Sequence, residues 1–196
     1  MTTLLFIAVA YLLGSLSFAV IVSRAMRLPD PRSFGSGNPG ATNVLRTGRK
    51  SAAILTLLGD IGKGWLAGLV GTMLLHQESA ILWVALASVT GHLHSAFLGF
   101  KGGKGVATAL GAALGVAPWI GLTLMGLWVG AVFLWKYSSG GALFAFAMFP
   151  IVALLFHRSW TFIGFACVVS LLIWVRHKDN LVRLWSGTES RIGQAS

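Results

Sequence analysis

The chain has very few acidic residues and little charge overall. Only five of its 196 residues are Asp or Glu, and all charged residues together make up 10% of the sequence. A typical soluble domain has about 25% charged residues. Hydrophobic residues make up 56% of the chain, and its mean hydropathy is +0.79. These values exclude an ordinary soluble domain and indicate an integral membrane protein.

Cysteine is nearly absent as well. The single Cys167 excludes an intrachain disulfide and a cysteine-ligated zinc site, and we expect this residue, which lies in an apolar stretch, to be buried. His92 and His94 are two positions apart with no carboxylate close by in the sequence, and this spacing on a helix directs the two rings to different faces. The sequence therefore predicts no metal site.

Long apolar runs predict the fold. A helix needs about 20 residues to cross roughly 30 Å of hydrocarbon. Six runs are clear, and a seventh, at about 105–117, is short and rich in Gly and Ala. We therefore expect an all-α integral membrane protein with seven transmembrane helices, formed as a single domain over residues 1–196. The six clear runs are about 3–23, 51–75, 80–98, 119–135, 140–156 and 159–175.

The positive charges predict the orientation in the membrane. Residues 1–23 contain no Lys or Arg, and Arg24 and Arg27 follow the first run, which is the reverse of a signal peptide. With the N-terminus outside and seven crossings, the C-terminus is cytoplasmic, and 13 of the 15 Lys and Arg residues lie on the cytoplasmic side. The net charge of +10 then reflects topology and not nucleic-acid binding. The 13 residues are Arg24, Arg27, Arg32, Arg46, Arg49, Lys50, Lys101, Lys104, Lys136, Arg176, Lys178, Arg183 and Arg191.

Two features inside the apolar runs concern helix packing. Asp60 and Lys63 lie three residues apart on one helical face, as either a structural brace or part of the wall of a site. Glycines four residues apart let helix backbones approach closely, so we expect them to support compact packing of the bundle. These glycines are Gly64 with Gly68, Gly111 with Gly115, and Gly126 with Gly130.

Two glycine-rich polar loops lie between the apolar runs. The first loop, residues 35–43, reads GSGNPGATN, and the second loop, residues 100–108, reads FKGGKGVAT. Unobstructed backbone N–H groups can form a concave anion-binding nest, and Arg46 and Lys104 would supply positive charge beside it. His177, at the cytoplasmic end of the last run, could hold a phosphate or act as a base. The loops predict chemistry on a phosphorylated compound at one membrane surface.

Several motifs in the same order resemble one family. They are residues 35–46, Asp60-x-x-Lys63-Gly64, Gly91-His92 followed by residues 100–108, and His177-x-x-Asn180-x-x-Arg183-Leu184. On these motifs the chain resembles the bacterial acyl-phosphate:glycerol-3-phosphate acyltransferases, the PlsY family. His94 and Ser95 depart from the family, which commonly has an aromatic residue and a proline at these two positions.

The resemblance implies an acyltransferase of phospholipid synthesis in the bacterial inner membrane, with its active site on the cytoplasmic face. It would move a fatty acyl group from acyl phosphate to the sn-1 hydroxyl of glycerol 3-phosphate, giving lysophosphatidic acid and phosphate. The implied partners are these substrates and membrane lipid, with no nucleic acid and no obligate protein partner. No cofactor and no metal is expected. A transporter of a phosphorylated metabolite and a noncatalytic binding scaffold are the alternatives.

The resemblance also implies the site residues. His177, Lys104 and Arg46 would be catalytic, with either His177 or a substrate phosphate oxygen accepting the proton from the hydroxyl. Ser36 and Asn180 would join them around glycerol 3-phosphate. The remaining residues implied to bind substrate, mainly the acyl-phosphate head group, are Gly37, Asn38, Gly40, Thr42, Asn43, Gly102, Gly103, Gly105 and Ser139.

Overall fold

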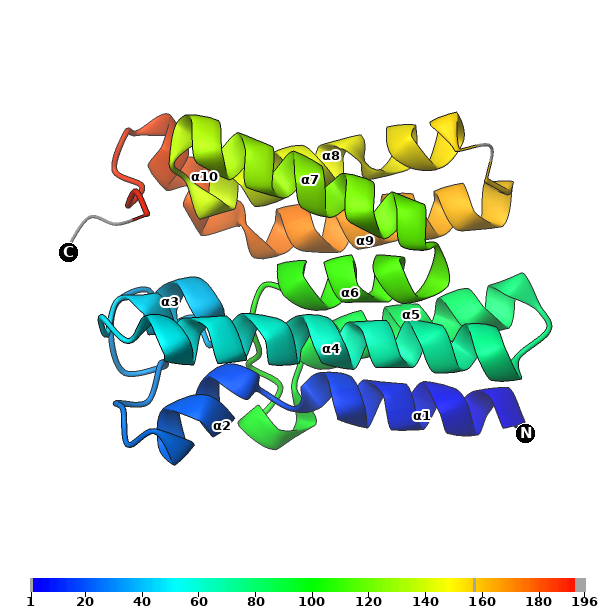
Figure 1. The fold of residues 1–196 in the computed structure, drawn as a ribbon, viewed down its shortest axis with the longest axis horizontal. Helices are drawn as coiled ribbons and strands as arrows, with labels where there is room; N and C mark the ends of the chain where they lie inside the picture. Colours follow the sequence, from blue (N-terminus) through cyan, green and yellow to red (C-terminus); the bar gives the residue numbers. More distant parts are fainter. Residues whose placement is uncertain (1, 157, 193–196) are drawn as a thin grey trace.

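The computed structural model describes residues 2–156 and 158–192, and every regular element in these ranges is a helix. The helices run side by side along the length of the molecule (Figure 1). In chain order they are α1 (Thr2–Ser15), α2 (Phe18–Ala25), α3 (Ala41–Leu45), α4 (Lys50–Leu74), α5 (Glu78–Leu93), the 3-10 turn η1 (Ala96–Leu98), α6 (Val106–Val116), α7 (Pro118–Trp135), α8 (Ser138–Leu155), α9 (Trp160–Arg176) and α10 (Lys178–Trp185).

The lengths and composition of these helices fit a membrane protein. Four segments are long and apolar enough to cross a bilayer: α4, α5 with η1, α7 and α8. Two further crossings are possible if the bent pairs α1–α2 (44°) and α9–α10 (62°) each form one span. The remaining apolar helix, α6, has 11 residues and is about 16 Å long at 1.5 Å per residue. The all-helical prediction is confirmed for the described residues.

The short helix α6 lies at the centre of the bundle, in contact with α4, α5 and α7 (Figure 1). A Cβ atom on Gly64 would lie 2.0 Å from the Thr108 carbonyl oxygen, and one on Gly111 would lie 2.0 Å from the Ile61 carbonyl oxygen. Only glycine allows α4 and α6 to approach so closely, which confirms the packing role expected at these positions.

The third glycine pair does not take part in this packing. A Cβ atom on Gly126 or Gly130 would meet nothing within 4 Å, so the expectation that these residues support packing of the bundle is wrong. They lie on a face of α7 that no other helix covers.

Cys167 is exposed on the outer face of α9, so the expectation that it is buried is wrong. In a membrane protein, an apolar residue is as well placed against lipid as inside the bundle.

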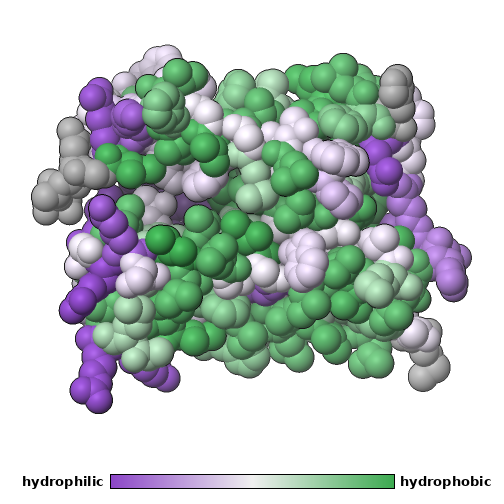
Figure 2. Space-filling view, viewed as in Figure 1, coloured by the Kyte–Doolittle hydropathy of each residue, from purple (hydrophilic) through white to green (hydrophobic). Residues whose placement is uncertain are grey.

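Most positive charge gathers at one end of the bundle. The loop between α2 and α4, the turn between α7 and α8, and the chain after α9 meet there, while the N-terminus lies at the opposite end (Figure 1). We call this end, formed by residues 24–50, 136–139 and 176–192, the basic end. Hydrophobic side chains cover the middle of the bundle, and hydrophilic ones lie mostly toward its ends (Figure 2).

Candidate active site

A cavity of about 310 Å³ lies at the basic end. Its walls come from the first glycine loop, α3, α4, the end of α5, the start of α6, α7, the start of α8, the α9–α10 junction, α10 and the chain that follows it. Eleven of the 14 site residues expected from the sequence line this cavity. They are Ser36, Asn38, Gly40, Thr42, Asn43, Arg46, Lys104, Gly105, Ser139, His177 and Asn180.

Three helices present their N-terminal turns to the cavity. Val106 and Ala107 belong to the first turn of α6, Ser139 to that of α8, and Asn180 to that of α10. The first backbone N–H groups of a helix have no partner within the helix, and the helix dipole places partial positive charge there. Three helix N-termini around one cavity make it suited to bind anions through backbone N–H groups alone, without any contribution from side chains.

The first glycine loop is held in shape by Asn43, whose residue exposure is only 2%. Its Nδ2 group donates to the carbonyl oxygens of Pro31 (2.6 Å) and Phe34 (3.2 Å), and its Oδ1 accepts from the Ser36 amide (3.1 Å). Both amide hydrogens are therefore engaged within the protein. Asn43 lines the cavity and shapes the loop that presents Ser36, and its expected contact with substrate stays a prediction.

The second glycine loop is folded back on the end of α5. The Gly102 amide donates to the Leu93 carbonyl (3.1 Å) and the Gly103 amide to the His92 carbonyl (3.0 Å). The Arg176 guanidinium donates to the carbonyl oxygens of Gly102 (2.9 Å) and Gly103 (3.1 Å). Gly102 and Gly103 therefore lie outside the cavity lining, and their amides are not free for a substrate. The loop acts by positioning Lys104 and Gly105, which do line the cavity.

Gly37, the third expected residue outside the cavity lining, has a positive φ of 65° and donates its amide to the Phe34 carbonyl (2.9 Å). Its place is in the turn of the first loop, which its left-handed conformation closes.

Lys104 provides a half-buried positive charge in the cavity. Its ammonium donates to Oδ1 of Asn180. Burial lowers the pKa of Lys104 to about 8, so the side chain is still mostly protonated at pH 7. A cation that has lost part of its hydration gains more from an anionic ligand than an exposed lysine does, because water screens it less.

His177 lies in the wall of the cavity with only 2% of its surface exposed. Its Nδ1 is 2.8 Å from the carbonyl oxygen of Ile173, which can only accept a hydrogen bond. Nδ1 therefore carries the proton in the neutral ring, and Nε2 is left with a free lone pair. Burial, with a smaller contribution from Lys104 and Arg176, lowers the pKa of His177 to about 4. The ring is neutral at pH 7 and able to accept a proton.

Asp60, Lys63 and His92 form a buried polar cluster behind the cavity. The Lys63 ammonium lies 2.8 Å from Oδ1 of Asp60 and 2.8 Å from Nδ1 of His92, and donates to the Leu16 carbonyl (2.5 Å). Leu16 is at the break between α1 and α2, so Lys63 braces that break. Asp60 and His92 also line the cavity, so of the pair expected to be either a brace or a site wall, Lys63 is the brace and Asp60 is part of the wall.

The sequence analysis assigns no site role to three residues that line the cavity, His92, Arg183 and Glu189. His92 and Arg183 belong to the motifs that carry the family resemblance, and His92 is otherwise weighed only as a metal ligand. Arg176, which holds the second glycine loop, is visible in the sequence only as a charge at the end of the last apolar run. Nothing in the sequence pattern points to Glu189. Among residues 2–156 and 158–192, no three His, Cys, Asp or Glu side chains gather as a possible metal site.

The fold and the cavity together define a multi-pass membrane protein with a cationic pocket at one end of its helical bundle. Residues 4–187 match the family described as glycerol-3-phosphate acyltransferase, and the chain belongs to this family. It is 53% identical over 200 residues to the glycerol-3-phosphate acyltransferase of Thiobacillus denitrificans, with all of both chains covered. It is 50% identical over 194 residues to that of Neisseria gonorrhoeae, covering 96% of both chains.

Two solved structures share the fold. Both are crystal structures of PlsY, described as an integral membrane glycerol 3-phosphate acyltransferase, one in its glycerol 3-phosphate form and one in its lysophosphatidic acid form. They are 34% identical to this chain, with TM-scores of 0.93 and 0.91, and the match covers 98% of this chain and 96% of each of theirs. The family resemblance seen in the sequence is confirmed, and so is an integral membrane fold.

Proposed function

We propose that the protein transfers a fatty acyl group from acyl phosphate to the sn-1 hydroxyl of glycerol 3-phosphate. The products are lysophosphatidic acid and inorganic phosphate, at the first step of bacterial phospholipid synthesis. The observation that carries this proposal is the meeting of Arg46, Lys104 and three helix N-termini at one cavity. Two phosphorylated substrates need such an accumulation of anion-binding groups.

The cavity also has an apolar wall, which suits the acyl chain of the donor. Leu57 of α4, Leu110 of α6 and Trp128 of α7 line it beside the polar residues. A pocket that binds one soluble and one fatty substrate needs both kinds of surface, and a few polar groups fix the orientation. A carrier of a small phosphorylated metabolite has no use for the apolar side.

In this proposal Ser36, Arg46, Lys104 and Asn180 hold glycerol 3-phosphate, and the start of α6 at Gly105 holds the head group of the donor. Asn38, Gly40, Thr42 and Ser139, which also line the cavity, complete the polar wall around the two phosphates. Binding both substrates side by side replaces a bimolecular encounter by a reaction within one complex, which accounts for much of the rate when the leaving group is as good as phosphate.

The proton of the attacking hydroxyl has two possible acceptors. His177 offers Nε2 from a fixed, neutral ring, because Nδ1 is held by the Ile173 carbonyl. An oxygen of a substrate phosphate is the other acceptor. Lys104 and Arg46 would stabilise the oxyanion and the departing phosphate, whose negative charge grows in the transition state.

We further infer that the chain crosses the membrane seven times as a single domain, residues 1–196, with α6 as the fourth crossing. The argument is the direction of the chain, which alternates between the two ends of the bundle from α1 to α9 (Figure 1). The basic end would face the cytoplasm, which places the N-terminus outside and the C-terminus and active site inside a bacterial inner membrane. No metal, cofactor or protein partner is required by this reaction.

The test is product formation by the purified protein in detergent. Glycerol 3-phosphate is supplied with palmitoyl phosphate in one reaction and with palmitoyl-CoA in another, without metal or nucleotide. Lysophosphatidic acid and phosphate are expected from the first mixture alone. Product from palmitoyl-CoA alone would overturn the assignment of acyl phosphate as the donor. Product from neither mixture would favour the transporter or the binding scaffold instead.

A further inference from the structure

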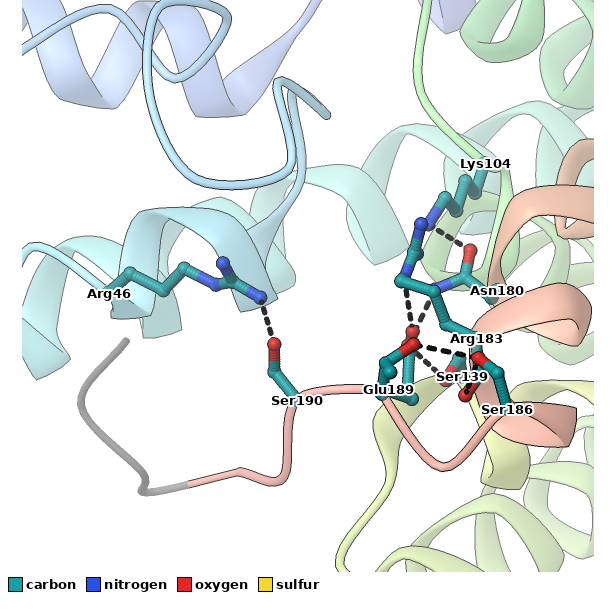
Figure 3. Close-up of polar contacts among 9 residues, drawn as sticks. Arg46, Lys104, Ser139, Asn180, Arg183, Ser186, Glu189 and Ser190 are labelled. Atoms are coloured by element: carbon teal, nitrogen blue, oxygen red, sulfur yellow. Dashed lines mark hydrogen bonds and ion pairs between the residues drawn. The ribbon is translucent and has the colours of Figure 1, made fainter.

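One of the chain's own carboxylates lies in the cavity proposed to bind phosphate. The chain after α10 turns back, and Glu189 reaches into the site (Figure 3). Its Oε1 accepts hydrogen bonds from the Ser139 hydroxyl (2.6 Å) and from Nδ2 of Asn180 (2.6 Å), and its Oε2 accepts one from Nε of Arg183 (2.6 Å). Every contact of this carboxylate is with a hydrogen-bond donor.

The groups around Glu189 make up a site for an oxyanion. A hydroxyl from the start of α8, an amide and a guanidinium from α10, and the nearby Lys104 ammonium, which contacts the same Asn180, converge from three separate parts of the chain. A carboxylate and a phosphate accept the same hydrogen bonds, and a phosphate carries more charge and more acceptor oxygens. Whatever phosphate binds to these donors cannot do so while Glu189 holds them.

The segment that carries Glu189 is itself anchored across the mouth of the cavity. The Ser190 hydroxyl accepts a hydrogen bond from Nη2 of Arg46 (3.1 Å), on the opposite wall of the cavity (Figure 3). The Ile192 amide donates to the Lys136 carbonyl (2.8 Å) at the turn before α8. One of the five N–H donors of Arg46, a proposed phosphate ligand, is thereby engaged as well. The segment, residues 187–192, begins where the family match ends.

The charge of the region explains why an acid is stable there. Burial works against the ionised form of Glu189, but hydrogen bonds from Ser139, Asn180 and Arg183 outweigh it and hold the pKa of the carboxyl below its ordinary value. The carboxylate in turn neutralises part of the positive charge that gathers in the cavity, and half-buried cations without a counter-charge are costly.

We propose that Glu189 occupies a phosphate subsite of the empty enzyme as an internal competitor, which a phosphorylated substrate must displace before it binds. The nature of that substrate rests on the proposed function. The contact lowers apparent affinity, because only the fraction of molecules with the segment released can bind.

The experiment compares Glu189→Gln with wild type and with Asp179→Asn. Asp179 is an exposed acid in the first turn of α10 that does not line the cavity, so its substitution removes the same charge from the region without emptying the subsite. Glu189→Gln is expected to lower the KM for a phosphorylated substrate and the inhibition constant of inorganic phosphate by roughly tenfold. The kcat and the melting temperature should change little, and Asp179→Asn should leave all of these within about twofold.

Two further variants separate the carboxylate from the segment that carries it. Ser190→Ala removes the hydrogen bond to Arg46 but leaves Glu189 and the donors around it in place, and should lower the same KM by roughly two- to threefold. Glu189→Ala repeats the main test without an amide that could hold the same donors. An unchanged or raised KM in both Glu189 variants would overturn the proposal.

Separate titrations identify the substrate that competes. A lower KM for glycerol 3-phosphate alone assigns the subsite to the acceptor, and a lower KM for acyl phosphate alone assigns it to the donor. Calorimetric binding of inorganic phosphate to the same variants needs no turnover. Tighter phosphate binding by Glu189→Gln therefore supports the subsite even if acyl transfer is absent. Normal turnover with equal phosphate affinities in all variants rejects the role of Glu189 as a competitor and leaves the proposed function standing.

Discussion

Replacing Lys104 by Gln is expected to remove most activity, because the side chain is a half-buried cation at the place where negative charge develops. Lys104 contacts Asn180 and lines the cavity, and burial already lowers its pKa to about 8. Gln keeps most of the length and can still hydrogen bond to Asn180. The substitution therefore isolates the positive charge.

The expected loss follows from what such groups contribute elsewhere. Removing one preorganised donor to a developing oxyanion costs about 2.7–4 kcal/mol, or about 10²–10³ in kcat. Lys104 is also proposed to hold a substrate phosphate in the ground state, so the KM for glycerol 3-phosphate should rise as well, and kcat/KM should fall at least 10³-fold. An exposed cation would contribute far less, because water and salt screen it.

Lys101→Gln is the matched control. Lys101 lies three residues earlier in the same loop, carries the same charge and is exposed outside the cavity. The assay is release of lysophosphatidic acid at saturating and at limiting glycerol 3-phosphate, with melting temperatures measured in detergent. Lys101→Gln should keep activity within about twofold of wild type. Activity of Lys104→Gln within threefold of wild type, or equal losses in both variants, would refute the reasoning.

Four other outcomes are expected. The KM for glycerol 3-phosphate should rise as pH increases through about 8, where Lys104 loses its proton and charge, and this rise should vanish in Lys104→Gln. The pKa of about 4 keeps His177 neutral from pH 5.5 to 8, so the pH dependence of kcat should show no loss from this group until the pH approaches 4. His177→Gln should lower kcat about 10²–10⁴-fold if the ring is the base, and less than tenfold if a substrate phosphate accepts the proton. Gly64→Val should lower the melting temperature by about 5 °C or more because the new side chain meets the backbone of α6, whereas Gly126→Val, which meets nothing, should not. Lys63→Met should destabilise the protein by about 3–5 kcal/mol, seen as a lower melting temperature, because it leaves a buried carboxylate without its partner.

The long helices could be predicted from the sequence because a membrane span is a local property. The expected run 51–75 is α4, Lys50–Leu74, and the expected run 119–135 is α7, Pro118–Trp135. The first run, 3–23, breaks near Leu16 into α1 and α2, which apolarity cannot reveal. The Leu16 carbonyl freed at the break is satisfied by Lys63, 47 positions further along the chain.

The site was predictable to the extent that its residues share local motifs. Arg46, Lys104, His177 and Asn180 all line the cavity, as expected from their places in the motifs. The exception is Gly102 and its neighbour Gly103, whose glycine-rich pattern predicts backbone N–H groups free to bind an anion. Their amides are used by carbonyl groups at the end of α5, and a local sequence cannot show which backbone groups a distant helix end will occupy. Glu189 was missed because an acidic residue in a polar tail has no recognisable pattern.

The shortness of α6 is what makes the site possible. Because residues 99–105 fold back on the end of α5, α6 begins inside the bundle and not at its surface (Figure 1). Its first turn, with Lys104 and Gly105 just before it, then lies at the floor of the cavity and points its free amides toward the basic end. A helix of about 20 residues at this position would fill the space that the cavity occupies. The glycines that allow α6 to pack against α4 hold it at this depth. In the sequence, α6 is the weakest candidate for a membrane span because it is short and rich in Gly and Ala. It is nevertheless the element that brings the anion-binding groups to the level of the apolar wall, where an acyl chain and a phosphate can meet.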